Sequence, residues 1–209
     1  MISSNLNSTK PVAATVATNA SRSIPRDTLD EALIERIATG DASSMAVFYT
    51  RHNVRVYRFA LRFVRNDSVA EEVTSEVFLD VWRKPFNFGG RCQVTTWLLA
   101  ITRHKAIAAL RRRTTDPLDD DYCDTIADSS DDPEITLDKR QRRTILFSCL
   151  SKLSPAHREI VDLVYYHQKT IDEVADIVGL ARNTVKTRMF YARKHLAELL
   201  GTKGIVAVY

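Results

Sequence analysis

The chain has 209 residues, which is enough for one or two domains with hydrophobic cores. Hydrophobic residues make up 44% and charged residues 27% of it, proportions that are ordinary for a globular protein and exclude a fibrous or wholly disordered chain. The formal net charge is only +4, so the total charge indicates no partner, and its distribution along the chain has to be examined instead.

The cysteines and the apolar segments indicate the cellular compartment of the protein. Cys92, Cys123 and Cys149 lie far apart with no C-x-x-C pair, so neither a disulfide framework nor a zinc site is predicted. No apolar run approaches the roughly 20 residues that span a bilayer, and no secretory signal is present. We therefore expect a cytoplasmic protein without membrane insertion.

Residues 1–26 are rich in Ser, Thr, Asn and Ala and contain no acidic residue. They lack helical periodicity, so a disordered N-terminal extension is predicted. The scattered Lys10, Arg22 and Arg26 leave an organellar transit peptide as the alternative, although no amphipathic face accompanies them.

Residues 27–113 predict a first helical domain. Thr28 with Glu31 and Ser68 with Glu71 have the spacing of capping boxes, and Asp41 is a suitable N-cap. Gly40, the pair Asn66–Asp67 and Pro85 separate helices that end near residues 39, 65 and 83, and a fourth helix is expected over 94–113. The residues expected to face the core share helical spacing: Leu29, Leu33, Ile34, Ile37, Met45, Phe48, Tyr49, His52, Val56, Phe59, Ala60, Phe63, Val69, Val73, Val77, Phe78 and Val81.

The charge between Trp82 and Thr115 has one sign. This span has no acidic residue, and its basic residues include Lys84, Arg91, Arg103, Lys105, Arg111, Arg112 and Arg113. Cations interleaved with aromatic rings suit a single-stranded nucleic acid, whose phosphates and bases they can bind. The alternative is that Trp97 and Phe88 are core residues and the basic residues form a solvated face.

Residues 114–138 have the opposite charge, with ten acidic and no basic residues up to Asp138. Such a composition cannot bury enough apolar area to fold, so a flexible acidic linker between two domains is predicted.

Residues 139–200 predict a second helical domain, followed by a tail, 201–209, for which we have no functional interpretation beyond a short strand or packing against a neighbour. The centre of this second domain is 170–199. There Thr170 and Glu173 form a capping box, and Gly179 provides a left-handed helix end. Asn183 is the expected N-cap of the next helix, which directs Val185, Met189, Ala192 and Leu196 inward. A helix, a glycine turn and a second helix with a basic face form the helix-turn-helix pattern of DNA-binding proteins. A plain helical hairpin with a solvated face is the alternative.

Two all-α domains, the second with a helix-turn-helix, resemble a bacterial sigma factor of the extracytoplasmic-function group of the sigma-70 family. The resemblance covers about Leu29 to Leu200. It is carried by VYRFALRFVRNDSVAEEVTSEVFLDVWR, TTWLLAITRHKAIAALRRR and LSPAHREIVDLVYYHQKTIDEVADIVGLARNTVKTRMFYARKHL. It implies that the first domain binds core RNA polymerase and recognises and melts the minus-10 element. The second domain would read the minus-35 element, and transcription of a stress- or signal-responsive regulon would follow.

The resemblance also implies roles for residues. The outward carboxylates of the third helix, Glu71, Glu72, Glu76 and Asp80, correspond to the polymerase-docking face. The loop from Phe86 to Val94, with Phe88 and Arg91, corresponds to the loop that captures a flipped base. The fourth helix would grip the single strand through Trp97, Arg103, His104, Lys105 and Arg111. In the recognition helix, Lys186 and Thr187 are expected at base edges, Phe190 and Tyr191 beside them, and Arg188 and Arg193 on phosphates.

Two positions depart from the family pattern. His104 stands where many relatives have Asn, and Tyr191 stands where many have Arg. The usual GTVKSR is NTVKTR here, which keeps Lys186 and Arg188 and a small hydroxyl at Thr187.

Other classes of function are less consistent with the sequence. A sigma mimic that only sequesters an anti-sigma protein has no use for DNA-facing cations, and a response regulator or ligand-binding repressor would need a receiver domain or a pocket. An enzyme is not expected, because no histidine pairs with a cysteine at metal-ligand spacing and no phosphate-binding loop is present. We expect no metal and no cofactor, and we expect an anti-sigma partner.

Overall fold

The computed structural model describes residues 29–115 and 137–203, and all the regular structure in these ranges is helical. The first group of helices is α1 (Asp30–Ala38), α2 (Ala42–Val64), α3 (Asp67–Arg83), the 3₁₀ turn η1 (Pro85–Phe88) and α4 (Val94–Thr115). The second group is α5 (Leu137–Ser151), α6 (Pro155–Val161), the π turn η2 (Asp162–Tyr166), α7 (Ile171–Val178) and α8 (Arg182–Gly201). The predicted all-α class is thus confirmed over the described part of the chain.

Three predictions concern segments outside the described residues. The N-terminal extension and the end of the tail fall there, and so does nearly all of the acidic linker. The described ends of α4 and α5, at Thr115 and Leu137, leave 116–136 for that linker. The domain boundaries therefore stay predictions.

Several predicted helix ends are confirmed by side-chain hydrogen bonds. The Asp41 carboxylate accepts bonds from the backbone N–H groups of Ser43 and Ser44 at the start of α2. Ser154 caps α6, with Pro155 in the first turn. Helix α7 ends at Gly179, whose φ of 69° lies in the left-handed region that glycine adopts without strain.

Three predicted caps are wrong. Helix α1 begins at Asp30 with Leu29 in the N-cap position and without a side-chain cap, and Thr28 lies outside the described residues. The cap of α3 is Asn66, not Ser68, because the Asn66 carboxamide oxygen accepts the N–H of Val69 at 3.0 Å. Helix α8 begins at Arg182 with Ala181 as N-cap, so the predicted cap Asn183 lies inside the helix.

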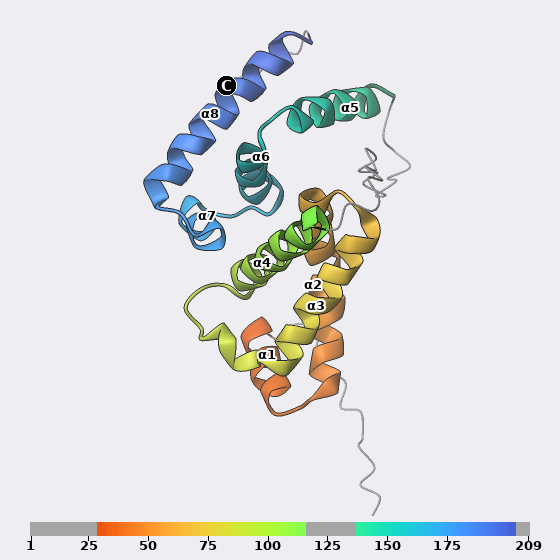
Figure 1. The fold of residues 1–209 in the computed structure, drawn as a ribbon. Helices are drawn as coiled ribbons and strands as arrows, with labels where there is room; N and C mark the ends of the chain where they lie inside the picture. Colours follow the sequence, from red (N-terminus) through yellow and green to blue (C-terminus); the bar gives the residue numbers. More distant parts are fainter. Residues whose placement is uncertain (1–28, 116–136, 204–209) are drawn as a thin grey trace, which may run out of the picture.

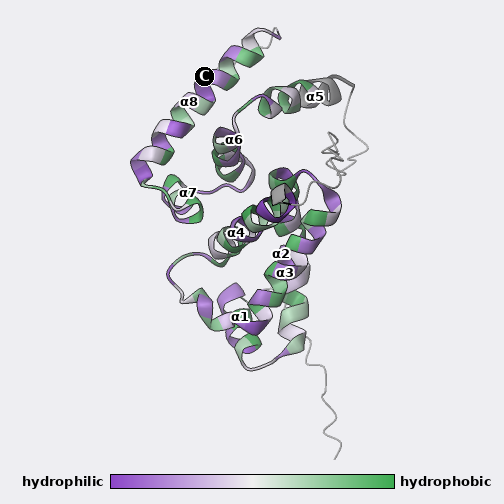
Figure 2. Cartoon of the chain, viewed as in Figure 1, coloured by the Kyte–Doolittle hydropathy of each residue, from purple (hydrophilic) through white to green (hydrophobic). Residues whose placement is uncertain are grey.

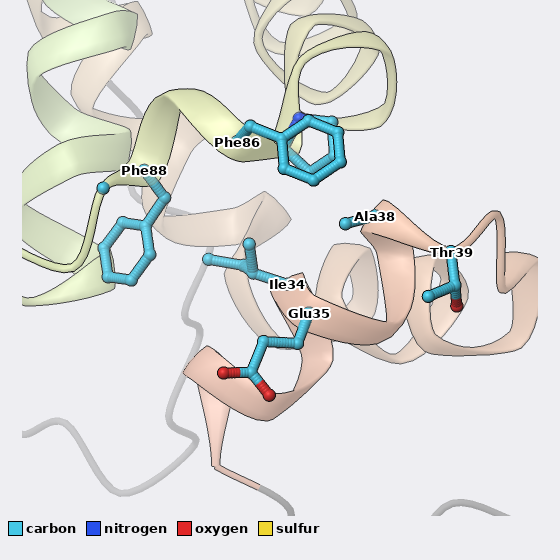
Figure 3. A pocket seen from close by; sticks show the side chains of 8 residues that line it. Ile34, Glu35, Ala38, Thr39, Phe86 and Phe88 are labelled. Carbon is cyan, nitrogen blue, oxygen red and sulfur yellow. The ribbon is translucent and has the colours of Figure 1, made fainter.

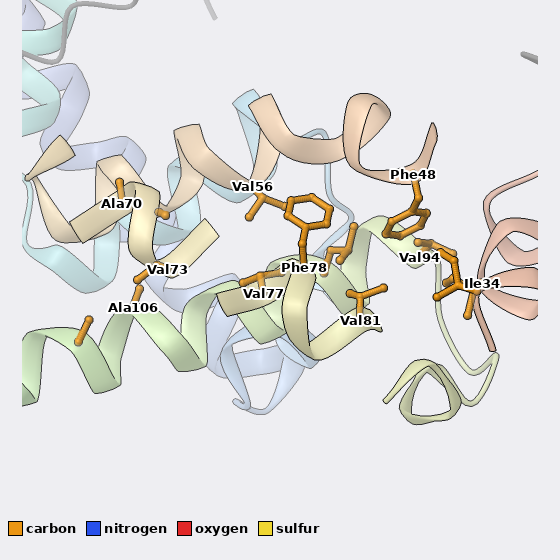
Figure 4. Packing of buried hydrophobic residues seen from close by; sticks show 14 of the residues in the cluster. Ile34, Phe48, Val56, Ala70, Val73, Val77, Phe78, Val81, Val94 and Ala106 are labelled. Atoms are coloured by element: carbon orange, nitrogen blue, oxygen red, sulfur yellow. The ribbon is translucent and has the colours of Figure 1, made fainter. Parts of the chain in front are cut away.

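The first hydrophobic core lies among α1, α2, α3 and α4 (Figure 4). Its centre consists of buried aliphatic and aromatic residues that the helical spacing predicted, among them Leu33, Ile37, Phe48, Val56, Val73, Val77 and Val81. Leu29 and Tyr49 were also expected in this core, but they are 71% and 45% exposed. Leu29 precedes the first turn of α1, so the helical spacing does not extend to it.

His52 is an interior residue of α2, as predicted, and it connects α2 to α1. It is 3% exposed, and its Nε2 lies 2.9 Å from Oδ2 of Asp30. Burial alone would raise the pKa of Asp30, but hydrogen bonds from His52 and Arg51 outweigh burial and lower the pKa.

The second hydrophobic core joins the two groups of helices. It contains Leu153, Ile160, Leu163, Val174, Ile177, Val185 and Met189 from the second group. It also contains Phe59 of α2 and Leu99 of α4, which are 2% and 0% exposed. Helix α7 packs directly against α4, as Figure 1 shows, while α8 extends away from the first group. Figure 2 shows hydrophobic and hydrophilic residues alternating around α8, as expected for a helix with one buried side.

Within the described ranges, every helix is either too short or too polar to cross a lipid bilayer.

Candidate nucleic-acid interface

Helix α8 presents a polar and aromatic face opposite its buried one. Val185, Met189 and Ala192 are buried against the second core, as the sequence predicted. The residues predicted to contact double-stranded DNA lie on the other side: Lys186, Thr187, Phe190, Tyr191 and Arg193 are exposed, and Arg188 is half-buried. The exposed side is therefore free of core packing and has the composition of a DNA-reading helix.

Two aromatic residues give this face an unusual shape. Phe190 and Tyr191 are 63% and 54% exposed, and their ring centroids lie 5.5 Å apart in an edge-to-face arrangement. The guanidinium of Arg193 lies 5.6 Å from the centroid of the Tyr165 ring, in cation–π contact with the π turn η2. The Thr187 hydroxyl donates to the carbonyl of Asn183 at 2.9 Å, so its oxygen remains an acceptor toward solvent.

The helix before α8 is fixed by a reciprocal cap. The Thr170 hydroxyl accepts the N–H of Glu173, and the Glu173 carboxylate accepts the N–H of Thr170, as the predicted capping box requires. Burial alone would raise the pKa of Glu173, but hydrogen bonds from Lys169, Thr96 and Thr170 outweigh burial and lower the pKa to about 2. Glu173 is therefore ionised at neutral pH and anchors the start of α7.

The loop between α3 and α4 holds two phenylalanines in different environments. Phe88 is half-buried and packs edge-on against Trp97, with ring centroids 5.4 Å apart. Both rings lie against the first core, as the alternative interpretation of the sequence proposed for them. Gly89 and Gly90 have φ values of 56° and 65°, which let the chain reverse here without strain.

Phe86 is an aromatic residue that the sequence analysis did not assign to the site. Its side chain is 80% exposed, although it follows the buried Pro85 directly. Phe86 and Phe88 line a shallow pocket of about 410 Å³ between η1 and α1, together with Ile34 and Ala38 (Figure 3). The sequence signal that could have assigned Phe86 to the site is its position in a glycine-containing loop that starts with proline.

The cations of α4 are engaged by carboxylates in this structure. Nε of Arg103 lies 2.5 Å from Oε1 of Glu159 on α6. Lys105 pairs with Asp80 at 2.8 Å and with Glu76 at 3.3 Å. Desolvation would lower the pKa of Lys105, but the two carboxylates outweigh it and raise the pKa. Arg91, His104 and Arg111, which were also predicted at the interface, are exposed.

Two of the four carboxylates of α3 that were expected to point outward are only partly exposed and also pair with a neighbouring helix. Glu71 and Glu72 are exposed, but Glu76 and Asp80 turn toward α4 and bind Lys105. The reason is that Glu76 and Asp80, one turn apart, lie on the edge of α3 that borders the basic helix α4.

Cys92 lies in the loop before α4 and is half-buried. Burial and the carboxylate of Asp176 raise the pKa of its thiol. A raised pKa reduces the fraction of the reactive thiolate at neutral pH.

Comparisons with known proteins agree with this arrangement of helices. The family model described as Sigma-70 region 2 matches residues 48–115, and the model described as Sigma-70, region 4 matches residues 149–198. The first match contains the loop and α4, and the second contains the helix-turn-helix.

Curated relatives match nearly the whole chain. The ECF RNA polymerase sigma factor SigK of Mycolicibacterium vanbaalenii is 29% identical over 196 residues, covering 91% of this chain and 99% of the relative. The protein of the same name from Mycobacterium tuberculosis H37Rv is 31% identical over 176 residues, covering 81% of this chain and 92% of the relative.

Solved structures share the fold. CnrH in complex with the cytosolic domain of CnrY has a TM-score of 0.60 and 21% identity, covering 83% of this chain and 97% of CnrH. The sigma factor RpoE in complex with the anti-sigma factor NepR from Bartonella quintana also has a TM-score of 0.60. It is 24% identical, and the match covers 73% of this chain and 94% of that chain.

Proposed function

The chain belongs to the extracytoplasmic-function group of the sigma-70 family, and we propose that it uses α8 to read the minus-35 element and α4 with its preceding loop to open the minus-10 element. As a promoter-recognition sigma factor, it binds core RNA polymerase and promoter DNA and is not an enzyme. The polymerase carries out the chemistry, and the sigma factor selects the start site.

The observation that carries the minus-35 proposal is the exposed face of α8. Lys186 and Thr187 lie in its first two turns, where a recognition helix contacts base edges in the major groove. Phe190 supplies an apolar surface for a thymine methyl group. Arg188 and Arg193 reach phosphates, which fixes the position of the helix without selecting a sequence.

The minus-10 proposal is supported by exposed groups on the loop and on α4. A base that leaves the stack must be held by stacking and by hydrogen bonds. Phe86 offers an exposed ring beside a shallow pocket, and Arg91 in the same loop and His104 on α4 are exposed as well. We assign the stacking role to Phe86, because the ring of Phe88 already packs against Trp97.

The polymerase-docking proposal is confined to the outer face of α3. Glu71 and Glu72 are exposed there, and Leu79 and Trp82 are 43% and 39% exposed on the same helix. Charged and apolar exposed groups on one helix are typical of a protein–protein contact. Glu76 is instead shared with Lys105, so it links the polymerase-docking face to α4.

The test is transcription with purified core polymerase and this protein on a library of randomised promoters. We expect RNA from one class of start sites, with preferred bases near positions minus 10 and minus 35. Transcripts without any preferred upstream sequence would contradict the proposal. Failure to transcribe, together with tight binding to an anti-sigma protein, would favour the alternative of a sigma mimic.

The cellular setting is part of the proposal. Polymerase and promoters lie in the bacterial cytoplasm, so we place this protein there, and we assign it a stress- or signal-responsive set of genes. The CnrH and RpoE structures are complexes with CnrY and with the anti-sigma factor NepR. We therefore expect an anti-sigma partner here as well.

A further inference from the structure

Two neighbouring tyrosines of the π turn η2 each hold an arginine of a different helix. The ring of Tyr166 faces α2, where the guanidinium of Arg62 lies 3.5 Å from the ring centroid. The ring of Tyr165 faces α8, where the guanidinium of Arg193 lies 5.6 Å from the ring centroid. Both distances are within the range of a cation–π contact. Tyr165 is nevertheless 59% exposed, so its contact with Arg193 lies at the surface of the second domain.

The two arginines differ in how their charge is compensated. Arg62 is mostly buried and also pairs with the carboxylate of Asp162, so its charge is neutralised within the protein. Arg193 is exposed, and no carboxylate of the described residues forms an ion pair with it. An aromatic face attracts a guanidinium without accepting its N–H groups in the plane of the group. Arg193 therefore keeps a full charge and free donors beside Tyr165, which is what an anion requires.

The position of Arg193 on α8 indicates which anion it meets. Lys186, Phe190 and Arg193 have the spacing i, i+4 and i+7, so they share one face of the helix, and all three are exposed. Seven residues of α-helix rise about 10 Å, which is close to the width of the major groove, about 12 Å. With Lys186 at the base edges, Arg193 lies at the edge of the groove, where the phosphates are. A cation at that place contacts the DNA backbone instead of bases.

The contact with Tyr165 also lowers the entropy that Arg193 loses on binding. A long arginine side chain gives up much of its rotamer freedom when it is fixed on a phosphate. Part of this freedom is already lost in the free protein, because the ring restricts the guanidinium. The ring has a firm support, since Leu163 and His167 on either side of it in η2 are buried. Such ordering before binding raises affinity without any new contact.

We propose that Tyr165 is a positioning residue for DNA recognition, whose ring holds Arg193 ready for a phosphate at the edge of the major groove of the minus-35 element. This role rests on the proposed function, because it presupposes that α8 lies in that groove. Tyr165 contacts no base, so it raises the affinity for all sequences alike. A residue outside the recognition helix thereby belongs to the DNA-binding surface.

The test measures the affinity of holoenzyme for the promoter selected from the library and for point variants of its minus-35 element, over a salt series. Tyr165→Leu removes the ring and keeps the charge of Arg193. We expect about two- to fivefold weaker binding to every one of these sequences. The slope of log affinity against log salt should stay unchanged, because the number of phosphate contacts stays the same.

Tyr165→Phe is the matched control, because it keeps the aromatic face and removes only the hydroxyl. We expect it to bind DNA as the wild type does. A loss for Tyr165→Phe equal to that for Tyr165→Leu would overturn the positioning role, since the hydroxyl and not the ring would then be responsible.

A double-mutant cycle shows whether Tyr165 acts through Arg193. In an Arg193→Ala protein, Tyr165→Leu should cause no further loss of affinity. In a Lys186→Ala protein, the same change should keep its full two- to fivefold effect, because Lys186 lies two turns away from Arg193. Equal effects of Tyr165→Leu in the two backgrounds would overturn the proposal.

Thermal unfolding of each variant separates a folding defect from a defect in positioning. We expect unchanged melting temperatures, because the Tyr165 side chain is mostly exposed. If Tyr165→Leu destabilises the protein, Tyr165→Gln replaces it, and the cycle with Arg193→Ala is measured below the melting temperature. If the wild type prefers one minus-35 sequence but Tyr165→Leu binds as tightly, the positioning role is wrong and the proposed function stands. A wild-type holoenzyme without any minus-35 preference would refute the proposed function and the role of Tyr165 with it.

Discussion

Lys186 and Arg193 are both exposed cations on α8, but they lie two turns apart. Lys186 is near the helix start, where side chains enter the major groove. Arg193 lies beyond the middle, beside Tyr165, where the helix leaves the groove. The two residues therefore have different tasks in the proposed complex.

We expect Lys186→Ala to relax the preference for one minus-35 sequence, with a loss of about 1–3 kcal/mol on the preferred site only. Arg193→Ala should weaken binding to all sequences alike and reduce the slope of log affinity against log salt by about one. Holoenzyme binding to the selected promoter and to point variants, over a salt series, measures both. Sequence-independent losses for both variants would contradict this division, and Lys152→Ala is the control.

Phe86→Ala should slow promoter opening and leave the fold intact. An 80% exposed side chain contributes little to stability, so we expect a change within about 0.5 kcal/mol. Loss of one stacked base costs about 1–3 kcal/mol, which corresponds to at least fivefold slower opening. The rate is measured by 2-aminopurine fluorescence in the minus-10 element. Leu29→Ala, at another exposed apolar residue, should have no effect, and an equal effect would refute a stacking role.

Glu173 predicts a specific dependence of stability on pH. Its pKa in the folded protein, about 2, is below the ordinary value of 4.5. Its contribution is therefore present above the ordinary pKa and is lost as pH falls toward the folded pKa. We expect Glu173→Gln to be less stable than the wild type at pH 7, and the difference to shrink between about pH 5 and about pH 2. Urea unfolding at several pH values measures this, and a constant difference would exclude ionisation as its cause.

Among the elements, α7 depends most clearly on its cap. It is only 8 residues long, so its first turn is a large part of the helix. We expect Thr170→Ala to destabilise the second domain by about 1 kcal/mol, because it removes the acceptor for the Glu173 N–H. Thr170→Ser keeps the hydroxyl and should lose much less. Chemical denaturation compares them, and equal losses would show that the methyl group matters instead of the cap.

The helices were predictable because their cores repeat at helical spacing, but the caps between them were less so. Asn66 and Ser68 are both good capping residues, and the Glu71 spacing favoured the wrong one. Only the extended backbone of Asn66, with φ of −146°, decides between them. At α8, only two residues follow Gly179 before the helix begins, so no room remains for Asn183 as a cap.

The candidate site was predictable where a helix buries a single face and leaves the other exposed. The outward residues of α8 follow from the inward Val185 and Met189 by geometry alone. Helix α3 has a charged neighbour, and the turning of Glu76 toward Lys105 depends on a contact that periodicity does not describe. Phe86 and Phe88 have similar sequence surroundings, and only packing distinguishes them.

At the scale of the whole molecule, no sequence pattern indicated that the two domains pack together. Leu99 fits an ordinary helix stripe, and Lys169 reads as a solvated residue of a loop. Their shared core is visible only when α7 is placed on α4. A contact between distant segments requires complementary surfaces, and each surface alone looks like part of its own domain.

A fragment that ends at Thr115 tests this packing. Its own core, with Phe48 and Val77, is complete, so we expect it to fold. Phe59 and Leu99 lose their cover, so we expect a lower melting temperature than in the full chain and stronger binding of a hydrophobic dye. Replacing both residues by polar ones should remove the dye signal. Equal melting temperatures in fragment and full chain would show that the packing contributes no stability.

Because of the shared core, the packing of the two groups of helices and the contacts to DNA depend on different residues. Leu99 sits in contact with the second domain while the bases would be read by other side chains of the loop and α4. A substitution at Leu99 or Phe59 is therefore expected to weaken the packing of the two groups of helices and to leave the proposed DNA-contacting side chains unchanged. A lineage can thus vary the stability of this packing independently of the residues that would contact DNA.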